Sequence, residues 1–375
     1  MDFVRISPPS AQNVDAEGIS NFLQALNNDP QLEAHGLIIH RNGYRIAEGY
    51  WAPHQAQDLR LVYSLSKSFS GTALSLMIGE GRLGLDDLVQ DYLPEYFETA
   101  DPAFQNLRIR HLASMASGHD KETNGLARQL EPDDPVKGFL RIPPAAEPGT
   151  LFAYNQPPVL ALVTILQRLA GQRLLDYLQP RLFEPLGIKD ARWAQHQPDI
   201  DLGYSGLYIN LDAAARLGQL YLEDGVWQGN RLLPEGWVSQ ASAVQTPNPM
   251  NTEPDWQQGY GFQLWRSRHG YRGDGAMGQY MVVLPEQNAL IAMFSCLNNM
   301  QRVLDLMWEH LLPAMPTTPA SLPVSAHDAD ERLAMQLQQL ARPTAAQRLN
   351  GTAPIPADQS FTPETAPERL AGKST

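Results

Sequence analysis

The sequence predicts an α/β (α+β) fold in which an antiparallel sheet flanked by helices adjoins a helix-rich lobe. A hairpin pattern at residues 35–50 and strand patterns at residues 260–297 lie near opposite ends of the chain. The residues between them are mostly of helical pattern, interrupted by Pro and Gly. Because a strand needs partners, we expect the two end groups to form one sheet and the middle to form a second lobe.

The chain of 375 residues is long enough for two lobes with a sizeable core. We expect residues 1–66 and 200–312 to form the sheet lobe, and residues 67–199 to form the helix-rich lobe. Residues 313–375 are rich in Pro, Ala and Thr. We interpret them as a loosely held C-terminal tail with one amphipathic stretch near 328–341.

The first elements follow from periodicity and turn signals. Apolar residues recur at helical spacing over 14–27, which predicts a helix. Asn42-Gly43 lies between two apolar runs and is a strong hairpin signal. The next helix opens near Ser64 and is expected to end at the glycines that begin with Gly79.

The later elements are predicted in the same way. Asp212 is expected to cap a helix that runs to about Glu223. The other expected helices cover 107–115, 159–170, 174–183 and 303–312, and the expected strands cover 260–266, 279–284 and 290–297.

Composition excludes several classes of partner. The formal net charge of −13 and the pI near 5.1 argue against binding to nucleic acid or to an anionic membrane. The N-terminus lacks a signal-peptide pattern, and no apolar run approaches the roughly 20 residues of a membrane span. We therefore expect a cytoplasmic protein. The single cysteine, Cys296, lies in an apolar run and is expected to be a buried structural thiol.

The sequence predicts neither a cofactor nor a metal. Two Gly-x-Gly-x-x-Gly matches begin at Gly79 and Gly273, but neither has the strand before it and the helix after it that a dinucleotide site needs. The histidines show no metal-site spacing, and there is no Walker loop.

Ser64 and Lys67 form the strongest chemical signal. Residues three apart on a helix are surface neighbours, so the lysine amine can reach the serine hydroxyl. Of the five lysines, only Lys67 has a serine three residues before it. The apolar residues that follow at helical spacing would hold Lys67 near the core, and burial lowers the pKa of an amine. A serine beside such an amine is a candidate nucleophile.

At this point the chain resembles the penicillin-recognising serine hydrolase superfamily, which includes class C β-lactamases, D,D-peptidases and related esterases and amidases. The Ser-x-x-Lys of Ser64 and Lys67 is similar to the family's first motif. Pro148-Gly149 followed by Tyr154 is similar to the segment that carries the second, and Gly273-Asp274-Gly275 falls at the third. The resemblance covers much of residues 35–310 and implies a β-lactamase/transpeptidase-like fold.

The third motif is most similar to that of the branch of 6-aminohexanoate-dimer hydrolases and related carboxylesterases.

Two departures from the family's motifs bear on the substrate. Where the family has an amide two places after the tyrosine, this chain has Gln156, and Asn155 is a competing candidate. Where the family has a cation, this chain has Asp274 next to Gly275, with Arg272 as a partial substitute. These residues are the candidate substrate-binding set.

The resemblance implies a serine hydrolase that cleaves small esters or amides through an acyl-enzyme on Ser64. Lys67 or Tyr154 would be the base, and the backbone N–H groups of Ser64 and Ala276 would form the oxyanion hole. Because a cation at the third motif would hold a substrate carboxylate, its absence argues against β-lactamase or D,D-peptidase activity. These activities stay alternatives, as does a non-catalytic scaffold that only binds a ligand.

Overall fold

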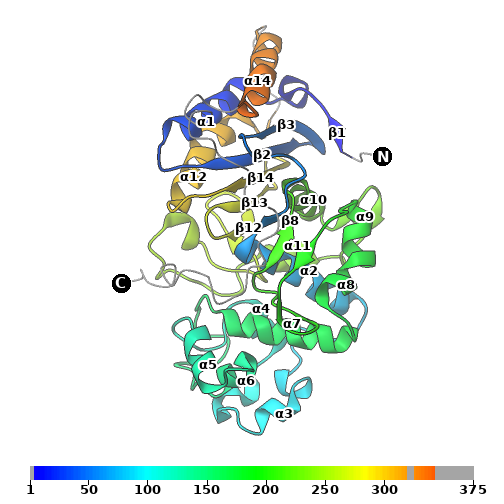
Figure 1. The fold of residues 1–375 in the computed structure, drawn as a ribbon, viewed down its shortest axis with the longest axis vertical. Helices are drawn as coiled ribbons and strands as arrows, with labels where there is room; N and C mark the ends of the chain where they lie inside the picture. The colour runs from blue at the N-terminus through cyan, green and yellow to red at the C-terminus, as the bar shows by residue number, and fades with distance from the viewer. Residues whose placement is uncertain (1–3, 319–324, 343–375) are drawn as a thin grey trace.

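The computed structural model describes residues 4–318 and 325–342, and its centre is a seven-stranded sheet (Figure 1). The strand order is β1-β3-β2-β14-β13-β12-β11. Neighbouring strands are antiparallel, except that β1 runs parallel to β3, so the sheet is mixed at this edge. The strands are β1 (Arg5–Ile6), β2 (Ala34–Arg41), β3 (Tyr44–Tyr50), β11 (Trp265–Arg266), β12 (Tyr271–Gly275), β13 (Gln279–Leu284) and β14 (Ala289–Ser295).

The two ends of the chain meet in the middle of this sheet, as the sequence predicts. In the β2–β14 pair, Ile39 lies opposite Ile291. The β2–β3 hairpin turns at Asn42 and Gly43, whose φ angles of 52° and 77° are those of a tight turn that asparagine and glycine accept. The Asn-Gly turn therefore determines the β2–β3 hairpin, and burial of both faces of the sheet determines that β14 pairs with β2.

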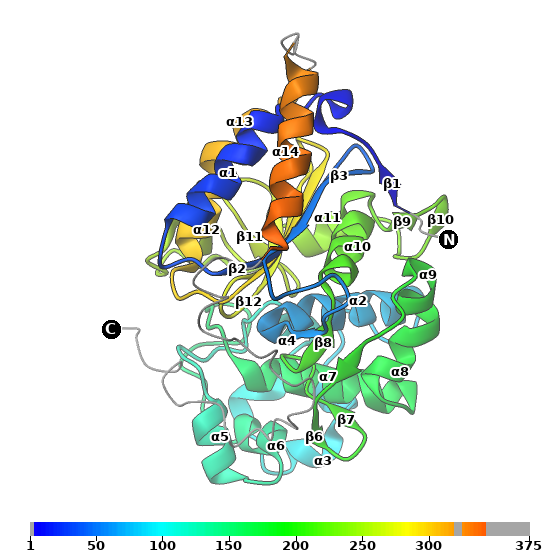
Figure 2. The same ribbon diagram turned by 45° about the horizontal axis from the view of Figure 1, so that its top comes forward.

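Side chains alternate between two cores along each strand. Leu37 and Ile39 belong to one apolar cluster, whereas Ile38 belongs to the other. Figure 2 shows the helices that cover the two faces. One face packs under α1 (Ala16–Asn28), α12 (Met300–Leu306) and α14 (Ala326–Leu340), and the other packs on α10 (Leu211–Leu222) and α2 (Ser66–Gly79).

The segment between the two sheet parts is mostly helical. Its principal helix, α7 (Gln156–Ala170), is buried along most of its length and ends at Gly171, whose φ is +66°. The helix expected over 174–183 begins as α8 and changes to a π-helical turn over Gln179–Phe183. The other helices here are α3 (Pro94–Phe97), α4 (Ile109–Ala113), α5 (Asn124–Leu130), α6 (Pro135–Leu140), α8 (Leu174–Leu178) and α9 (Glu184–Leu186). The exact lobe boundaries stay a prediction.

The remaining elements are short. They include two short α-helices, α11 (Trp237–Ser242) and α13 (Leu312–Ala314), and a π-helical turn over Met307–Leu311 that joins α12 to α13. The short strands are β4 (Arg60–Leu61), β5 (Arg192–Trp193), β6 (Gln195–Gln197), β7 (Ile200–Asp201), β8 (Leu207–Ile209), β9 (Val226–Trp227) and β10 (Asn230–Arg231).

Some predicted elements differ from the structure. Asn210, not Asp212, caps α10, because its side chain accepts a hydrogen bond from Ala213 N at 2.9 Å. The strand expected over 260–266 is reduced to β11. The amphipathic stretch near 328–341 forms α14, which packs against α1 and β3, so this part of the predicted tail is not loosely held. Residues 343–375 of that tail lie outside the described residues.

Within residues 4–318 and 325–342, no helix has both the length and the apolar character that a membrane crossing requires. The cytoplasmic location stays a prediction, as does the lack of nucleic-acid partners.

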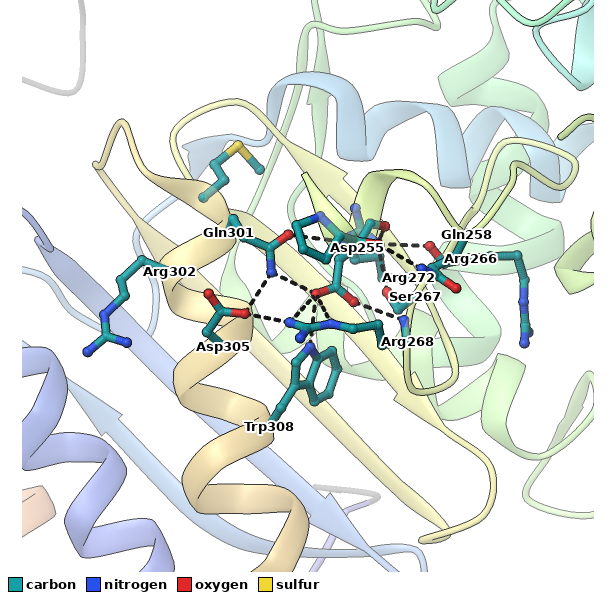
Figure 3. A network of polar contacts seen from close by, with 12 residues as sticks. Asp255, Gln258, Arg266, Ser267, Arg268, Arg272, Gln301, Arg302, Asp305 and Trp308 are labelled. Carbon is teal, nitrogen blue, oxygen red and sulfur yellow. Dashed lines mark hydrogen bonds and ion pairs between the residues drawn. The ribbon is translucent and has the colours of Figure 1, made fainter. Parts of the chain in front are cut away.

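A buried carboxylate ties the β11–β12 end of the sheet to the C-terminal helices (Figure 3). Asp255 Oδ2 accepts hydrogen bonds from Arg268 Nη2 at 2.8 Å, Gln301 Nε2 at 2.7 Å and Trp308 Nε1 at 3.0 Å. The backbone oxygen of Asp255 accepts a bond from Arg272 Nη1 at 2.9 Å. Hydrogen bonds to the ionised form hold the pKa of this carboxyl below its ordinary value, although burial alone would raise it. Asp255 thus fixes the position of Arg272.

We predict that Asp255→Asn lowers the free energy of unfolding by about 3–5 kcal/mol, because an amide NH₂ would face donors and leave the Arg268 charge partly unpaired. Urea denaturation measures this change. The control is Glu286→Gln in the exposed turn before β14, expected to change stability by less than about 0.5 kcal/mol. Equal stability of the two variants would contradict the assignment of Asp255 as a structural centre.

Candidate active site

Ser64 lies in a strained turn directly before α2. It belongs to a 3₁₀ turn, Tyr63–Leu65, and is half-buried. Tyr63 has a φ of +46°, a left-handed conformation that non-glycine residues adopt at a cost of about 1–3 kcal/mol and that clusters at functional sites. Ser66 anchors the turn, because its Oγ donates to Tyr63 O at 2.6 Å and accepts from Leu207 N at 3.1 Å.

Lys67 is buried beside Ser64, as predicted. Its side chain is 1% exposed, and its Nζ lies 3.1 Å from Ser64 Oγ. Nζ also donates to Gln156 Oε1 and to Tyr204 O, both at 2.8 Å. Burial lowers the pKa of Lys67 from 10.5 to about 7, while the negative charges of Asp274 and Glu122 act in the opposite direction.

The contacts of Lys67 fix the direction of its lone pair when the amine is neutral. Gln156 Oε1 and Tyr204 O are carbonyl oxygens and can only accept hydrogen bonds. They use both N–H bonds of a neutral amine. The lone pair of Nζ is then left for Ser64 Oγ, so the arrangement can take a proton from the serine hydroxyl.

Tyr154 comes from the segment before α7 and completes the group. Lys67 Nζ lies 4.8 Å from the centre of the Tyr154 ring. Burial raises the pKa of the Tyr154 phenol well above its ordinary value, and the charge of Asp274 raises it further. The phenol therefore keeps its proton near neutral pH, which suits a proton donor better than a base.

The two candidates for the amide position behave differently. Gln156 bonds to Lys67, as described above. Asn155 is fully buried and faces the other way, with its Oδ1 accepting from Thr123 N and Thr123 Oγ1, both at 3.0 Å. Gln156 thus lies at the reacting group, whereas Asn155 supports the loop that carries Thr123. Gln156 is the first residue of α7, and from this position its side chain, one methylene longer than that of asparagine, reaches Lys67.

The third motif lies on β12, packed directly against the Ser64 turn. A Cβ atom at Gly275 would lie 2.0 Å from Val62 O and 3.2 Å from Leu65 N, and a Cβ at Gly273 would lie 2.2 Å from Ser68 Oγ. Only glycine permits this approach of strand and helix. Ala276 follows at once, so its backbone is carried to the turn that holds Ser64.

Asp274 and Arg272 on the same strand neutralise each other. Arg272 Nε donates to Asp274 Oδ2 at 2.8 Å, and the Arg272 side chain is 0% exposed. Arg272 Nη1 donates to Ser267 Oγ at 2.6 Å, and its guanidinium lies 4.3 Å from the centre of the Trp256 ring. Burial raises the pKa of Asp274, and the neighbouring Arg272 charge opposes this rise. The Arg272 guanidinium therefore lies in the protein interior with its own partners and is not placed to bind a substrate carboxylate.

Three contributors to the site were not identified from the sequence: Tyr204, Glu122 and Trp265. Tyr204 supplies a backbone oxygen to Lys67, and a backbone contact leaves no residue-type signal. Glu122 influences Lys67 by charge, and its Oε1 accepts from Gln156 N at 3.4 Å. Trp265 stacks on Tyr154 with ring centres 5.1 Å apart.

Two features outside this group also bear on the sequence predictions. Cys296 is exposed, so the prediction of a buried thiol is wrong. In the described part of the chain, Glu33, His35 and His54 approach one another closely enough to suggest metal ligands. However, Arg60 donates to Nδ1 of both histidines at 2.9 Å, which places their hydrogens on Nε2, and His35 Nε2 then donates to Glu33. This bonding leaves His35 no lone pair for a metal.

Comparison with known proteins gives consistent results. The family model described as beta-lactamase matches residues 19–312. The 6-aminohexanoate-dimer hydrolase of Paenarthrobacter ureafaciens is 25% identical over 281 residues, which cover 69% of this chain and 71% of that protein. Esterase EstB of Burkholderia gladioli is 23% identical over 219 residues, covering 51% and 56% of the two chains. Among solved structures, a putative 6-aminohexanoate-dimer hydrolase from Bacillus anthracis superposes with a TM-score of 0.64 at 20% identity, covering 78% of this chain and 82% of that chain.

We predict that Gly275→Ala slows the labelling of Ser64 by a fluorophosphonate by about 10²–10³-fold, the loss expected when one oxyanion donor is misplaced. The added methyl group would collide with the Val62 carbonyl and push Ala276 away from Ser64. The rate is measured by intact mass. Gly125→Ala is the control, because a Cβ there meets nothing within 4 Å and should leave the rate unchanged. Unchanged labelling of Gly275→Ala would show that the close approach is unimportant.

Proposed function

This chain belongs to the beta-lactamase family and is a hydrolase of that fold, and we propose that it cleaves small uncharged esters or amides through an acyl-enzyme on Ser64. The observation that carries the proposal is the contact set of Lys67: Nζ donates to two carbonyl oxygens and lies 3.1 Å from Ser64 Oγ, so that the lone pair of the neutral amine would face Ser64. The names of the relatives, a 6-aminohexanoate-dimer hydrolase and an esterase, are those of enzymes that act on amides and esters.

In the proposed first step, Ser64 Oγ attacks the substrate carbonyl and its proton passes to Lys67 Nζ. Lys67 is favoured over Tyr154 as the base because the pKa of the amine is lowered to about 7, whereas that of the phenol is raised. The backbone N–H groups of Ser64 and Ala276 would stabilise the oxyanion, a contribution of roughly 2.7–4 kcal/mol for each donor.

In the second step, the tetrahedral intermediate collapses and the bond from the carbonyl carbon to the leaving oxygen or nitrogen breaks. Tyr154 gives its proton to the leaving group. Lys67 then returns to Tyr154 the proton that it took from Ser64 in the first step. Water then attacks the acyl-enzyme, Lys67 accepts a proton from this water, and Ser64 regains its proton as the carboxylic acid departs. The roles of base and acid thus stay with the same two groups in both halves of the reaction.

The charge distribution supports uncharged substrates. A carboxylate-bearing substrate such as a β-lactam or a peptide C-terminus needs a free cation near the third motif. Here Arg272 is buried and paired with Asp274, and Gly275 offers only backbone groups. Asp274 would repel an anion brought close to it. We therefore place β-lactamase and D,D-peptidase activity second, with ligand binding without catalysis third.

We predict that Ser64→Ala abolishes both hydrolysis of p-nitrophenyl butyrate and formation of a fluorophosphonate adduct. Intact mass before and after exposure measures the adduct, and absorbance measures turnover. Ser239→Ala removes an exposed serine hydroxyl far along the chain and should behave as wild type. If wild type forms no adduct and turns over no ester, the protein is a binder. If nitrocefin is hydrolysed about as fast as the ester, β-lactamase activity takes precedence.

We predict that kcat/KM for a neutral ester rises about tenfold per pH unit below about pH 7 and levels off above it, because the base is the uncharged form of Lys67. Gln156→Glu places a carboxylate beside Lys67, stabilises the ammonium and should shift this rise to higher pH. Stopped-flow rates across pH 5–9 measure both profiles. A flat profile, or one that Gln156→Glu leaves in place, would contradict Lys67 as the base.

A further inference from the structure

A cavity of about 280 Å³ lies at the edge of the sheet where β1 pairs with β3. Its walls come from the end of β2, the turn into β3, the C-terminal part of α10 and the strand β9, which Figure 2 shows on the same side of the molecule as β1. Two strands, β14 and β13, separate β2 from β12, the strand that packs on the Ser64 turn. The volume is close to the lower end of the range for small-molecule sites, roughly 300 Å³, and far above the roughly 30 Å³ that one water occupies. The cavity is therefore large enough for a small ligand and separate from the Ser64 site.

The contacts of Gln219 determine which nitrogen of His40 carries the hydrogen. A carboxylate only accepts, so the Gln219 amide turns its Nε2 toward Glu223 Oε1, at 2.7 Å. Gln219 Oε1 then faces His40 Nδ1 at 3.0 Å and accepts its hydrogen. Burial lowers the pKa of His40 from 6.5 to about 4, so the ring is neutral at pH 7. His40 Nε2 thus carries a lone pair and no hydrogen.

Two side chains of the cavity wall each carry a buried polar atom without a protein partner. Among the residues that the structure describes, none forms a hydrogen bond with His40 Nε2 or with Trp227 Nε1. His40 is 1% exposed and Trp227 is 6% exposed. Buried polar atoms in native proteins nearly always have a partner. His40 Nε2 needs a donor and the Trp227 indole N–H needs an acceptor, so a ligand that satisfies both must offer both functions.

The charges at the rim of the cavity favour an uncharged ligand. Glu223 and Arg5 are both exposed there, and the Arg5 guanidinium lies 6.0 Å from the centre of the Tyr44 ring. The carboxylate would repel an anion, and the guanidinium would repel a cation. A purely apolar molecule would leave His40 and Trp227 unpaired. A hydroxyl group is neutral and both donates and accepts at one atom, so it fits this wall.

We propose that this cavity binds a small uncharged polyhydroxyl compound, a monosaccharide or a polyol, whose hydroxyl groups donate to His40 Nε2 and accept from Trp227 Nε1. The rings of Tyr44 and Trp227 provide flat apolar surface for the carbon skeleton, and amide side chains at the rim can pair with further hydroxyls. This binding site is additional to the proposed hydrolysis at Ser64 and does not depend on it.

The test is an NMR titration of protein that carries ¹⁵N in its indole groups, with D-glucose, D-ribose and glycerol as probes. The chain has seven tryptophans, and we expect at least one probe at millimolar concentration to cause a saturable shift of the Trp227 indole resonance. The matched compound is 1,2,3-trimethoxypropane, whose ether oxygens accept but cannot donate to His40 Nε2, so it should cause no saturable shift. The inference is overturned if the three hydroxylated probes cause no shift, or if the ether binds as well as they do.

Trp227→Phe keeps an aromatic ring in the cavity wall, removes the N–H and identifies the Trp227 resonance by its loss. Its affinity for the bound probe, measured by calorimetry, should fall about tenfold. Trp51→Phe is the matched control, because it removes an indole N–H that Asn27 Oδ1 accepts at 2.7 Å outside the cavity, and it should bind as wild type does. Wild-type affinity in Trp227→Phe would contradict the proposed contact.

Thermal unfolding shows whether Trp227→Phe is folded. If it is not, Phe variants of the other tryptophans assign the Trp227 resonance by elimination, and its shift in wild type decides the inference. A shift of the Trp265 indole in place of Trp227 would put the probe at the Ser64 site and overturn the inference, because Trp265 stacks on Tyr154.

Discussion

The burial of the Lys67 amine is the constraint on which the rest of the site depends. A lysine side chain taken out of water loses its proton more easily, and only then can its nitrogen accept one from Ser64. Burial alone would leave the amine without hydrogen-bond partners. Gln156 and Tyr204 supply carbonyl oxygens, so the neutral form is satisfied and oriented at the same time. Each of these partners belongs to a different segment of the chain.

Close packing of β12 on the Ser64 turn provides the second constraint. Gly273 and Gly275 leave no side chain between the strand and the helix, so the backbone at Gly275 lies against the turn that holds Ser64. Tyr63, whose φ is +46°, belongs to the turn that makes this contact. Strain in such a turn persists because the surrounding structure holds it, here through Ser66 and its bonds to Tyr63 O and Leu207 N. The close packing of β12 on this turn thus holds the Ser64 side chain and the backbone after Gly275 in fixed relative positions.

The ion pair between Asp274 and Arg272 bears on which substrates the site could accept. Asp274 occupies the place where the motif resemblance implies a cation, and Arg272, which could have replaced it, is bound to Asp274 and to the backbone oxygen of Asp255. A buried pair of this kind is neutral overall and holds its geometry, but it offers little to an anionic substrate. The same pair keeps the Arg272 guanidinium away from any substrate.

Local patterns in the sequence determined the hairpin at Asn42-Gly43, the two-ended sheet and the proximity of Ser64 to Lys67, because these follow from periodicity and from spacing along one helix. They also identified Tyr154, but through similarity of motifs rather than through physics. The tertiary structure alone decided that Gln156 and not Asn155 faces Lys67, that Arg272 turns inward, and that Trp265 and the Tyr204 carbonyl belong to the site. These outcomes depend on which side chains meet across distant segments, and on backbone groups that every residue carries, so no local pattern encodes them. The sequence defines the type of each side chain, but tertiary packing determines which other group that side chain contacts.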